Sequence, residues 1–280
     1  MSKAIDKVEN NLSVGIIGCG WLGKVLAINL LEKNTSVLAT SSKLDNVNKL
    51  NQQSINAQQL TLPADVVQLA QHDVFTKHSL VIAITPQFKQ GRTDYADKIT
   101  QLVNAAQQRG LVERVILLSS TAIYNGLEGT VDEESLLNMA TEKVQILNAA
   151  EQTVLNFSKK GMVIRLAGLV GPDRHPGKFI MAKKTLGNST APVNLIHQQD
   201  AVGLIESLLQ ANSTHEIFNG VSDTHISKQH YYQAAAKALM LDPPLFAPEN
   251  INETRRVVIG EKAKQVLNYK FVYPDLLTWL

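Results

Sequence analysis

Short, continuous apolar runs alternate with longer segments of helical periodicity over the first 167 residues. The apolar runs lie at residues 14–17, 35–40, 78–84, 114–118 and 162–166, with a weaker one at 57–62. Helical periodicity follows at residues 43–53, 93–109 and 138–158. Continuous apolar runs are typical of parallel strands covered on both faces. The alternation therefore predicts an α/β fold, a doubly wound parallel sheet with right-handed crossovers.

The pattern changes beyond Gly168. Residues 168–190 are rich in Gly, Pro, Lys and Asn and are expected to form an irregular loop. Short strands are expected at 194–197 and 216–219, and helices at 199–210, 227–241 and 260–268. We expect residues 1–167 to form the main domain and residues 168–280 a smaller mixed lobe, interleaved with the main domain around 190–220. In open α/β sheets ligands bind at the carboxyl ends of the strands, so the cleft between the lobes is the expected substrate site.

The joint between the first strand and the first helix carries a glycine pattern, Gly18-Cys-Gly-Trp-Leu-Gly23. Gly18 permits a sharp turn, Gly20 lets the main chain approach a diphosphate, and Gly23 lets the helix pack on the strand. The helix start offers unpaired N–H groups to phosphate. Residues 18–23 (Gly18, Cys19, Gly20, Trp21, Leu22 and Gly23) are therefore predicted to bind a dinucleotide in a Rossmann-type domain. The alternative is a glycine-rich turn without a ligand.

The end of the second strand bears on the choice of nicotinamide cofactor. Sites that prefer NAD usually have Asp or Glu there, to bond the ribose 2′-hydroxyl. Here the stretch contains Thr40, Ser41, Ser42 and Lys43 and no carboxylate, which favours NADP. Asp45 is close in sequence and leaves NAD open, although it is expected inside the next helix. The alternative is a polar loop that holds no phosphate.

One further segment of the predicted cofactor site follows the strand at 78–84. Thr85 and Pro86 come directly after that apolar run. Their place at the carboxyl edge of the sheet predicts a contact with the cofactor.

Composition adds limits. The chain has 280 residues, a formal net charge of +2 and one cysteine, Cys19. Such a charge gives no reason to expect nucleic acid or a membrane surface as a partner. The first eleven residues are polar and charged, and no run of about 18 apolar residues occurs. We therefore expect a cytoplasmic protein without a disulfide, a membrane partner or a metal site.

Several stretches together resemble the extended and atypical short-chain dehydrogenase/reductase superfamily, in particular its NAD-dependent epimerase/dehydratase-like proteins. They are residues 18–23, Leu118-Ser-Ser-Thr-Ala-Ile-Tyr-Asn125, Val131-Asp-Glu133, Arg165-Leu-Ala-Gly-Leu-Val-Gly-Pro172, Asn194-Leu-Ile-His-Gln-Gln-Asp200 and Phe218-Asn219. The resemblance covers nearly the whole chain. It implies a nicotinamide cofactor and a sugar-type or nucleotide-sugar substrate.

The resemblance also implies catalytic residues, and here the chain departs from the family. Position matching gives Ser120, with Thr121 as a substitute, the role of binding a substrate oxygen. The family's Tyr-x-x-x-Lys pair on the next helix is missing, because its positions fall near Lys143 and Leu147. Tyr124 and Lys143 are the candidates to replace it. For Tyr124 the competing interpretation is packing, and for Lys143 it is a solvated surface.

Other polar residues have weaker claims. Arg92 is a candidate to hold an anionic substrate, and Arg174, His175 and Lys178 are candidates to hold a diphosphate. His197 is expected to be a satisfied polar residue, and Arg165 to pair with a carboxylate.

Two functions remain open on these residues. The first is an NAD(P)-dependent oxidoreductase or epimerase/dehydratase-like enzyme with a small-molecule substrate. The second is a non-catalytic NADP-binding sensor or regulatory protein. The helices at 93–109 and 138–158 are a candidate surface for a homodimer.

Overall fold

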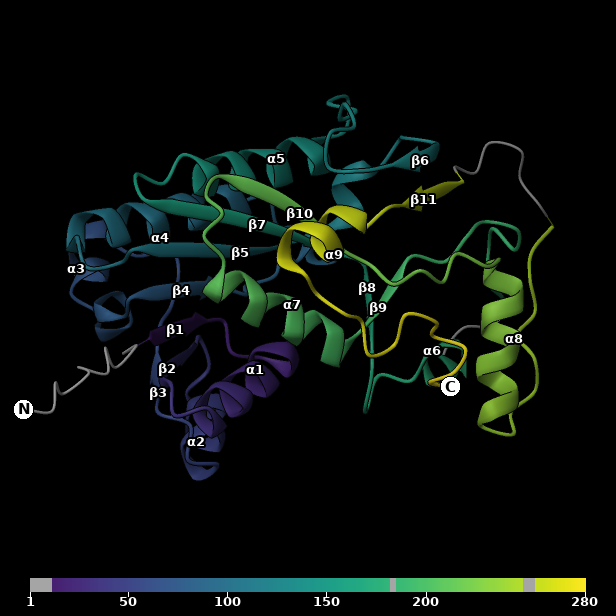
Figure 1. Ribbon diagram of the computed structural model, residues 1–280, viewed down its shortest axis with the longest axis horizontal. Coiled ribbons are helices and arrows are strands. Elements are labelled where there is room, and N and C mark those ends of the chain that lie inside the picture. Colours follow the sequence, from purple (N-terminus) through teal and green to yellow (C-terminus); the bar gives the residue numbers. More distant parts are fainter. Residues whose placement is uncertain (1–11, 182–184, 249–254) are drawn as a thin grey trace, which may run out of the picture.

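The computed structural model describes residues 12–181, 185–248 and 255–280, and its centre is a sheet of seven parallel strands (Figure 1). The predicted doubly wound α/β architecture is confirmed. Across the sheet, the strands run β3 (Ala57–Gln59), β2 (Ser36–Ser41), β1 (Ser13–Ile17), β4 (Ser79–Ile82), β5 (Arg114–Ser120), β7 (Lys160–Leu166) and β10 (Glu216–Gly220).

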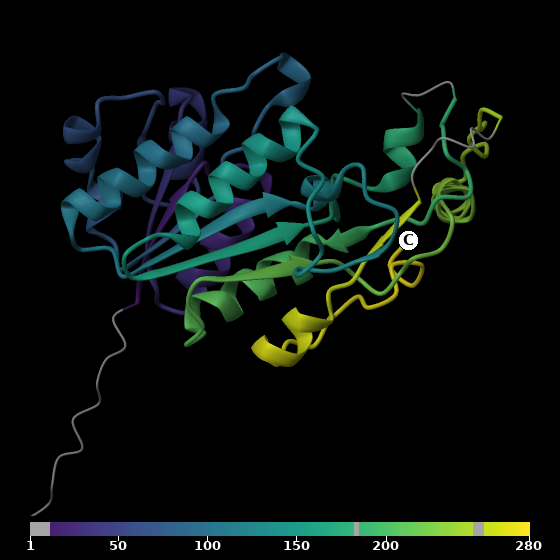
Figure 2. The same ribbon diagram turned by 90° about the horizontal axis from the view of Figure 1, so that it is seen from above.

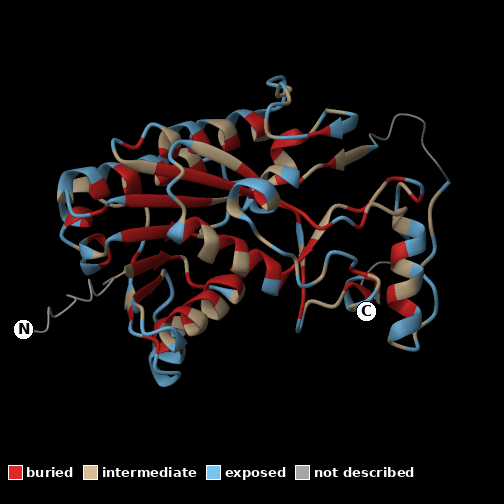
Figure 3. Ribbon diagram, in the orientation of Figure 1, coloured by how far each residue is buried: buried red, intermediate tan, exposed pale blue. Residues whose placement is uncertain are grey.

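Helices cover both faces of this sheet. Figure 2 shows α4 (Tyr95–Arg109) and α5 (Glu142–Leu155) on one face and α7 (Gln198–Gln210) on the other. The short α3 (Val66–Ala70) packs on α4, and α1 (Trp21–Glu32) packs on α7. The strands are consequently buried along most of their length (Figure 3), which explains why their sequences are continuous apolar runs. Another helix, α2 (Leu44–Gln52), lies beside β2 and β3.

The strand order reverses between β1 and β4. From β1 the chain moves outward to β2 and β3, and from β4 it moves the opposite way to β5 and β7. The loops that leave β1 and β4 therefore diverge at the carboxyl edge of the sheet. A crevice at such a reversal is where open α/β sheets bind ligands.

The remaining elements extend beyond the carboxyl ends of the strands (Figures 1 and 2). Two small parallel pairs join β8 (Gly168–Val170) to β9 (Leu195–His197) and β6 (Gly129–Val131) to β11 (Arg256–Val258). The helices α6 (Pro176–Met181) and α8 (Lys228–Ala238) lie here and pack on each other, whereas α9 (Glu261–Leu267) packs on β10 and α7. A separate small core forms around Val170, Val193, Tyr231 and Leu276. Because β10 is an edge strand of the main sheet and α7 covers one face of it, the chain crosses between the two parts. The boundary at residue 167 stays a prediction.

The carboxyl-terminal tail is tied to the main sheet by one buried carboxylate. Asp200, in the first turn of α7, accepts hydrogen bonds from the Tyr269 hydroxyl at 3.0 Å and from the main-chain N–H groups of Val272 and Tyr273 at 2.6 and 3.0 Å. These bonds hold residues 269–273 against α7. Within the described ranges, no helix combines the length and apolar character required to cross a bilayer.

One expectation is wrong. Residues 168–190 were expected to be irregular, but they contain the strand β8 and the helix α6. The partner of β8 is β9, more than twenty residues further on, and α6 packs against α8. Both elements depend on distant partners, so local composition does not reveal them. Residues 182–184 of the expected loop lie outside the described residues.

Candidate functional site

The turn after β1 requires glycine at its first position. Gly18 has φ of +88°, and a Cβ atom there would lie 2.9 Å from the main-chain nitrogen of Ile84. The turn is therefore pressed against the loop that follows β4. This contact brings the two diverging loops together at the reversal of strand order.

The other two glycines differ in their surroundings. A Cβ atom on Gly20 would meet nothing closer than the Gly18 carbonyl oxygen at 4.0 Å, so the turn is open on that side. A Cβ atom on Gly23 would lie 3.2 Å from Cγ2 of Ile16, so here α1 lies close to β1. No described side chain caps the start of α1. Open space, uncapped N–H groups and close helix packing are what a dinucleotide diphosphate requires.

Cys19 belongs to the framework of the turn. Its N–H donates to the carbonyl of Thr40 at 2.8 Å, and its own carbonyl accepts from the Asn46 side chain at 3.0 Å. Burial raises the pKa of the Cys19 thiol to about 11, so the reactive thiolate is scarce at neutral pH. Leu22 is buried in the core, and Trp21 contacts the second lobe.

At the end of β2, only some of the residues predicted to bind the 2′-phosphate of NADP are exposed to solvent. Thr40 is buried, whereas Ser42 and Lys43 are exposed. The Ser41 hydroxyl accepts from the Lys43 N–H at 3.3 Å. Asp45 lies in the first turn of α2, as expected.

The loop after β4 contains two residues of the predicted cofactor site, Thr85 and Pro86, and a third candidate, Lys143, packs against it. Thr85 is exposed and Pro86 half-buried. A single 3₁₀ turn, η2 (Phe88–Gln90), follows. Lys143, at the start of α5, places its ammonium 5.5 Å from the centre of the Phe88 ring. Lys143 therefore faces this loop at the carboxyl edge rather than projecting freely into solvent.

The end of β5 carries the candidate substrate-binding hydroxyls. Ser120 is half-buried, and its oxygen accepts from the Ala122 N–H at 3.1 Å, which caps the short helix η3 (Thr121–Tyr124). The Ser120 hydroxyl can still donate a hydrogen bond. Thr121 is buried.

Tyr124 lies in a buried polar network that the sequence did not reveal as a unit. Its hydroxyl donates to Oδ1 of Asn219 at 2.9 Å and accepts from Arg165 at 2.8 Å. Arg165 in turn binds both carboxylate oxygens of Glu151, to which the Ser119 hydroxyl also donates at 2.6 Å.

This network accounts for the surroundings of Tyr124. Tyr124 and Glu151 have no exposed surface, and burial raises the pKa of Tyr124. The expected ion pair of Arg165 with a carboxylate is confirmed. Tyr124 thus joins β5 to β7 and β10, the packing role left open by the sequence, and its catalytic role stays a prediction.

The other predicted anion-binding residues are spread over two loops. Arg92 lies 3.6 Å from Asp94. Arg174 stacks on the ring of Trp21. Burial and the charge of Lys178 lower the pKa of His175. The structure therefore brings Arg174, but not Arg92, against the glycine turn.

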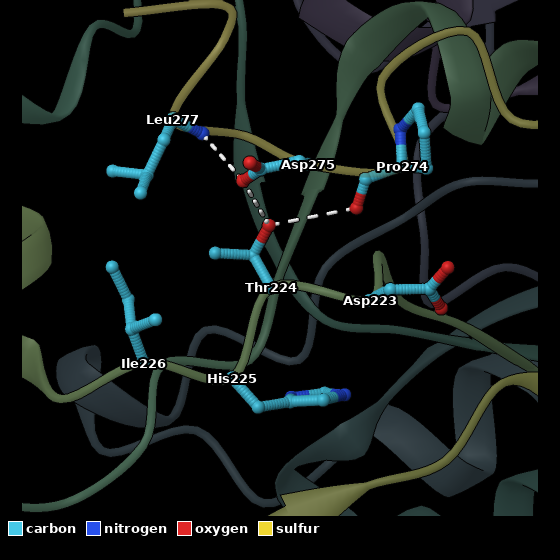
Figure 4. A pocket seen from close by; sticks show the side chains of 7 residues that line it. All are labelled: Asp223, Thr224, His225, Ile226, Pro274, Asp275 and Leu277. Carbon is cyan, nitrogen blue, oxygen red and sulfur yellow. Dashed lines mark hydrogen bonds between the residues drawn. The ribbon is translucent and has the colours of Figure 1, made fainter.

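Figure 4 shows a pocket of about 340 Å³ formed between residues 223–226 and the carboxyl-terminal segment at 274–277. It is lined by Asp223, Thr224, His225, Ile226, Pro274, Asp275 and Leu277. The Thr224 hydroxyl bonds to the carbonyl of Pro274 and to the carboxylate of Asp275. None of the predicted cofactor or catalytic residues lines this pocket, so it shares no residue with the predicted site.

Comparison with known proteins identifies a relative that matches nearly the whole chain. The chain is 31% identical over 268 residues to protein YeeZ of Escherichia coli, covering 94% of this chain and 97% of YeeZ. No family model matches the chain.

Solved structures with this fold are known at lower identity. An epimerase/dehydratase-like protein from Methylobacillus flagellatus, described as NAD-dependent, has a TM-score of 0.74 at 18% identity, covering 96% of each chain. ADP-L-glycero-D-manno-heptose-6-epimerase from Helicobacter pylori has 0.78 at 15%, covering 96% of this chain and 93% of the other. MoeE5, solved with UDP-glucose and NAD, has 0.74 at 19%, covering 95% and 96%. The resemblance to epimerase/dehydratase-like proteins is thereby confirmed at the level of the fold.

Proposed function

The chain belongs to the family of Escherichia coli protein YeeZ, and from this premise we propose that it is an NAD(P)-dependent oxidoreductase or epimerase/dehydratase-like protein. Its substrate would be a sugar or nucleotide sugar. The fold shared with sugar-nucleotide epimerases supports this proposal, although a fold alone does not define a reaction.

The observation that carries the proposal is the glycine turn. It lies where the strand order reverses. The space over Gly20 is open, because the nearest described atom to a Cβ atom placed there would be the Gly18 carbonyl oxygen at 4.0 Å. The main-chain N–H groups of Trp21 and Leu22 start an uncapped helix of 12 residues. These groups would hold the diphosphate of the cofactor.

Residues around the turn would hold the rest of the cofactor. Ser41, Ser42 and Lys43 would contact the adenosine ribose or its 2′-phosphate, and Thr85 and Pro86 would lie beside the nicotinamide half. The lack of a carboxylate at residues 40–43 favours NADP over NAD. Once bound, the nicotinamide would supply hydride transfer.

The chain's own residues would orient the substrate. The Ser120 hydroxyl would donate to a substrate oxygen, with Thr121 beside it. Lys143, held near the loop after β4 by Phe88, would supply a proton or a positive charge. Tyr124 is a poorer candidate for a catalytic acid than Lys143, because both hydrogen-bond partners of its hydroxyl lie inside the core.

The second candidate is a non-catalytic NADP sensor. The missing Tyr-x-x-x-Lys pair and the burial of Tyr124 favour it. A sensor would bind the cofactor without turning over a substrate.

Binding of the cofactor can be tested with a change at Gly20. Gly20→Ala adds a methyl group whose nearest described contact beyond its chain neighbours is the Gly18 carbonyl oxygen at 4.0 Å, but it would occupy the space of the diphosphate. We expect NADP and NAD binding, measured by calorimetry, to fall by about a hundredfold, with an unchanged thermal midpoint. Absence of dinucleotide binding by the wild-type protein at millimolar concentration would refute the proposal.

The choice of cofactor and the presence of turnover have separate tests. Lys43→Gln should weaken the binding of NADP about tenfold and leave the affinity for NAD within twofold. Tighter binding of NAD than of NADP by the wild type would end the preference for NADP.

Turnover is tested with a panel of keto-sugars, which should support NADPH oxidation that Ser120→Ala abolishes. Binding without turnover across the panel would favour the sensor.

A further inference from the structure

Trp21, the first residue of α1, makes two contacts with the turn at residues 171–174 and one with Gln198, the first residue of α7. The Trp21 indole N–H donates to the carbonyl of Pro172 at 3.1 Å, and the Gln198 side chain donates to the carbonyl of Trp21 at 3.1 Å. Gly171 lies against the indole, because a Cβ atom there would come within 3.3 Å of it. The turn at residues 171–174 therefore rests on Trp21, directly beside the glycine turn.

This turn carries an arginine over the indole. The guanidinium carbon of Arg174 lies 4.3 Å from the centre of a Trp21 ring, well within the range of a cation–π interaction. Within the described part of the chain, Arg174 forms no ion pair with a carboxylate, although Asp173 is its neighbour in sequence. Arg174 is half-buried, so a positive charge without an acidic partner is held at the start of α1.

We propose that Trp21 and Arg174 form a clamp in which Trp21 positions the Arg174 guanidinium to bind a nucleotide diphosphate. Arg174 is the binding residue and Trp21 the positioning residue. The inference rests on the proposed function, because the diphosphate would belong to the cofactor at the glycine turn or to a nucleotide-sugar substrate beside it.

The chemistry of the two side chains suits this role. A planar guanidinium offers paired N–H donors that match two phosphate oxygens, and it stays charged at any physiological pH. Stacking on an aromatic face restricts its rotamers and leaves its edges free to donate. The clamp would also link nucleotide binding to the turn at residues 171–174, because one of its residues starts α1 and the other lies in that turn.

The test is a double-mutant cycle read by calorimetry in the full-length protein. The variants are Arg174→Gln, Trp21→Leu and the double variant, and the ligands are NAD, NADP, ADP-ribose and UDP, the last with saturating dinucleotide. We expect each single variant to lose about tenfold in affinity, and the double variant to lose little more than either, since Trp21 acts through Arg174.

Two matched variants separate the clamp from general effects. Trp21→Phe keeps an aromatic face but removes the donor to Pro172, and should lose less than Trp21→Leu. Lys237→Gln removes an exposed charge from α8 in the same lobe and should leave every affinity unchanged. Thermal midpoints of all variants check that the fold persists.

The ligands distinguish the sources of the diphosphate. Losses for NAD, NADP and ADP-ribose alike would identify the cofactor, and a loss for UDP alone would identify the substrate. Additive losses in the double variant, or unchanged affinities in Arg174→Gln, would overturn the clamp while leaving the proposed function intact. If the wild type binds UDP through Arg174 but no dinucleotide, the proposed function fails and the clamp stands; if it binds neither, both fail.

Fluorescence provides an independent readout. The chain has two tryptophans, Trp21 and Trp279, so Trp279→Phe leaves Trp21 as the only indole. Ligand binding that draws Arg174 toward a phosphate should change the Trp21 emission, and Arg174→Gln should remove that change. An emission change that persists in Arg174→Gln would contradict the clamp.

Discussion

Two segments at the carboxyl edge of the sheet treat polar groups in opposite ways. After β1, the glycine turn leaves space over Gly20 and main-chain donors without a described side-chain cap. Around β5 and β7, Ser119 and Arg165 both donate hydrogen bonds to the Glu151 carboxylate inside the core. One segment keeps hydrogen-bonding capacity for a ligand, and the other uses its capacity within the protein.

The difference teaches where ligand chemistry belongs in this chain. A buried ion pair stabilises only when both partners are present, because each charge lost its water on folding. Groups committed in this way are poor candidates for catalysis, whatever their side-chain type. Exposed main-chain donors at a helix start remain available to an anion.

The largest expected effect is the loss of Glu151. Glu151→Gln leaves Arg165 buried with a weakened partner, and Ser119 loses a charged acceptor. We expect the free energy of unfolding to fall by about 3–5 kcal/mol, measured by urea denaturation. Glu142→Gln, an exposed change on the same helix, should stay within about 0.5 kcal/mol. Equal free energies of unfolding for the two variants would show that the buried network does not stabilise the fold.

The next effect separates two glycines of the same turn. Gly18→Ala forces alanine into a positive φ and brings its methyl group 2.9 Å from the Ile84 nitrogen. We expect a loss of about 3 kcal/mol, whereas Gly20→Ala should lose less than about 1 kcal/mol. Equal losses would remove the distinction between a structural and a ligand-binding glycine.

The smallest effect concerns a buried group that is not fully satisfied. His197 is 3% exposed and lies 4.1 Å from the Tyr273 ring; Nδ1 accepts from the Gln199 N–H, and Nε2 has no partner among the described residues. This finding only partly matches the expected satisfied histidine. Burial lowers the pKa of His197 to about 4.

The sign of the pH effect follows from that pKa. Between about pH 6.5 and 4 the unfolded chain binds the proton and the folded chain does not, so stability falls as pH falls through this range. The contribution at pH 5 relative to pH 7 is about 2 kcal/mol. His197→Asn, which keeps an acceptor for Gln199, should flatten the pH dependence of urea denaturation. The exposed His230→Asn should keep the wild-type slope; an unchanged slope in His197→Asn would contradict the assignment.

The sequence predicted the strands of the main sheet and the glycine turn well, because both depend on local patterns. Continuous apolar runs mark buried strands, and Gly18, Gly20 and Gly23 mark the joint between strand and helix. The β8 strand, the α6 helix and the Trp21 contacts with the second lobe escaped it. Trp21 and Arg174 are more than 150 residues apart, and nothing in the sequence around either residue predicts their contact.

The sequence by itself determined a Rossmann-type sheet and the place of a turn suited to a diphosphate, since continuous apolar runs and the steric freedom of glycine are local properties of the chain. Only the tertiary structure decided that Tyr124 and Glu151 are enclosed, and that Arg174 reaches Trp21. The physical reason is that burial and partnership are relations between distant segments. The same side chain is a ligand group or a packing group according to what folds against it.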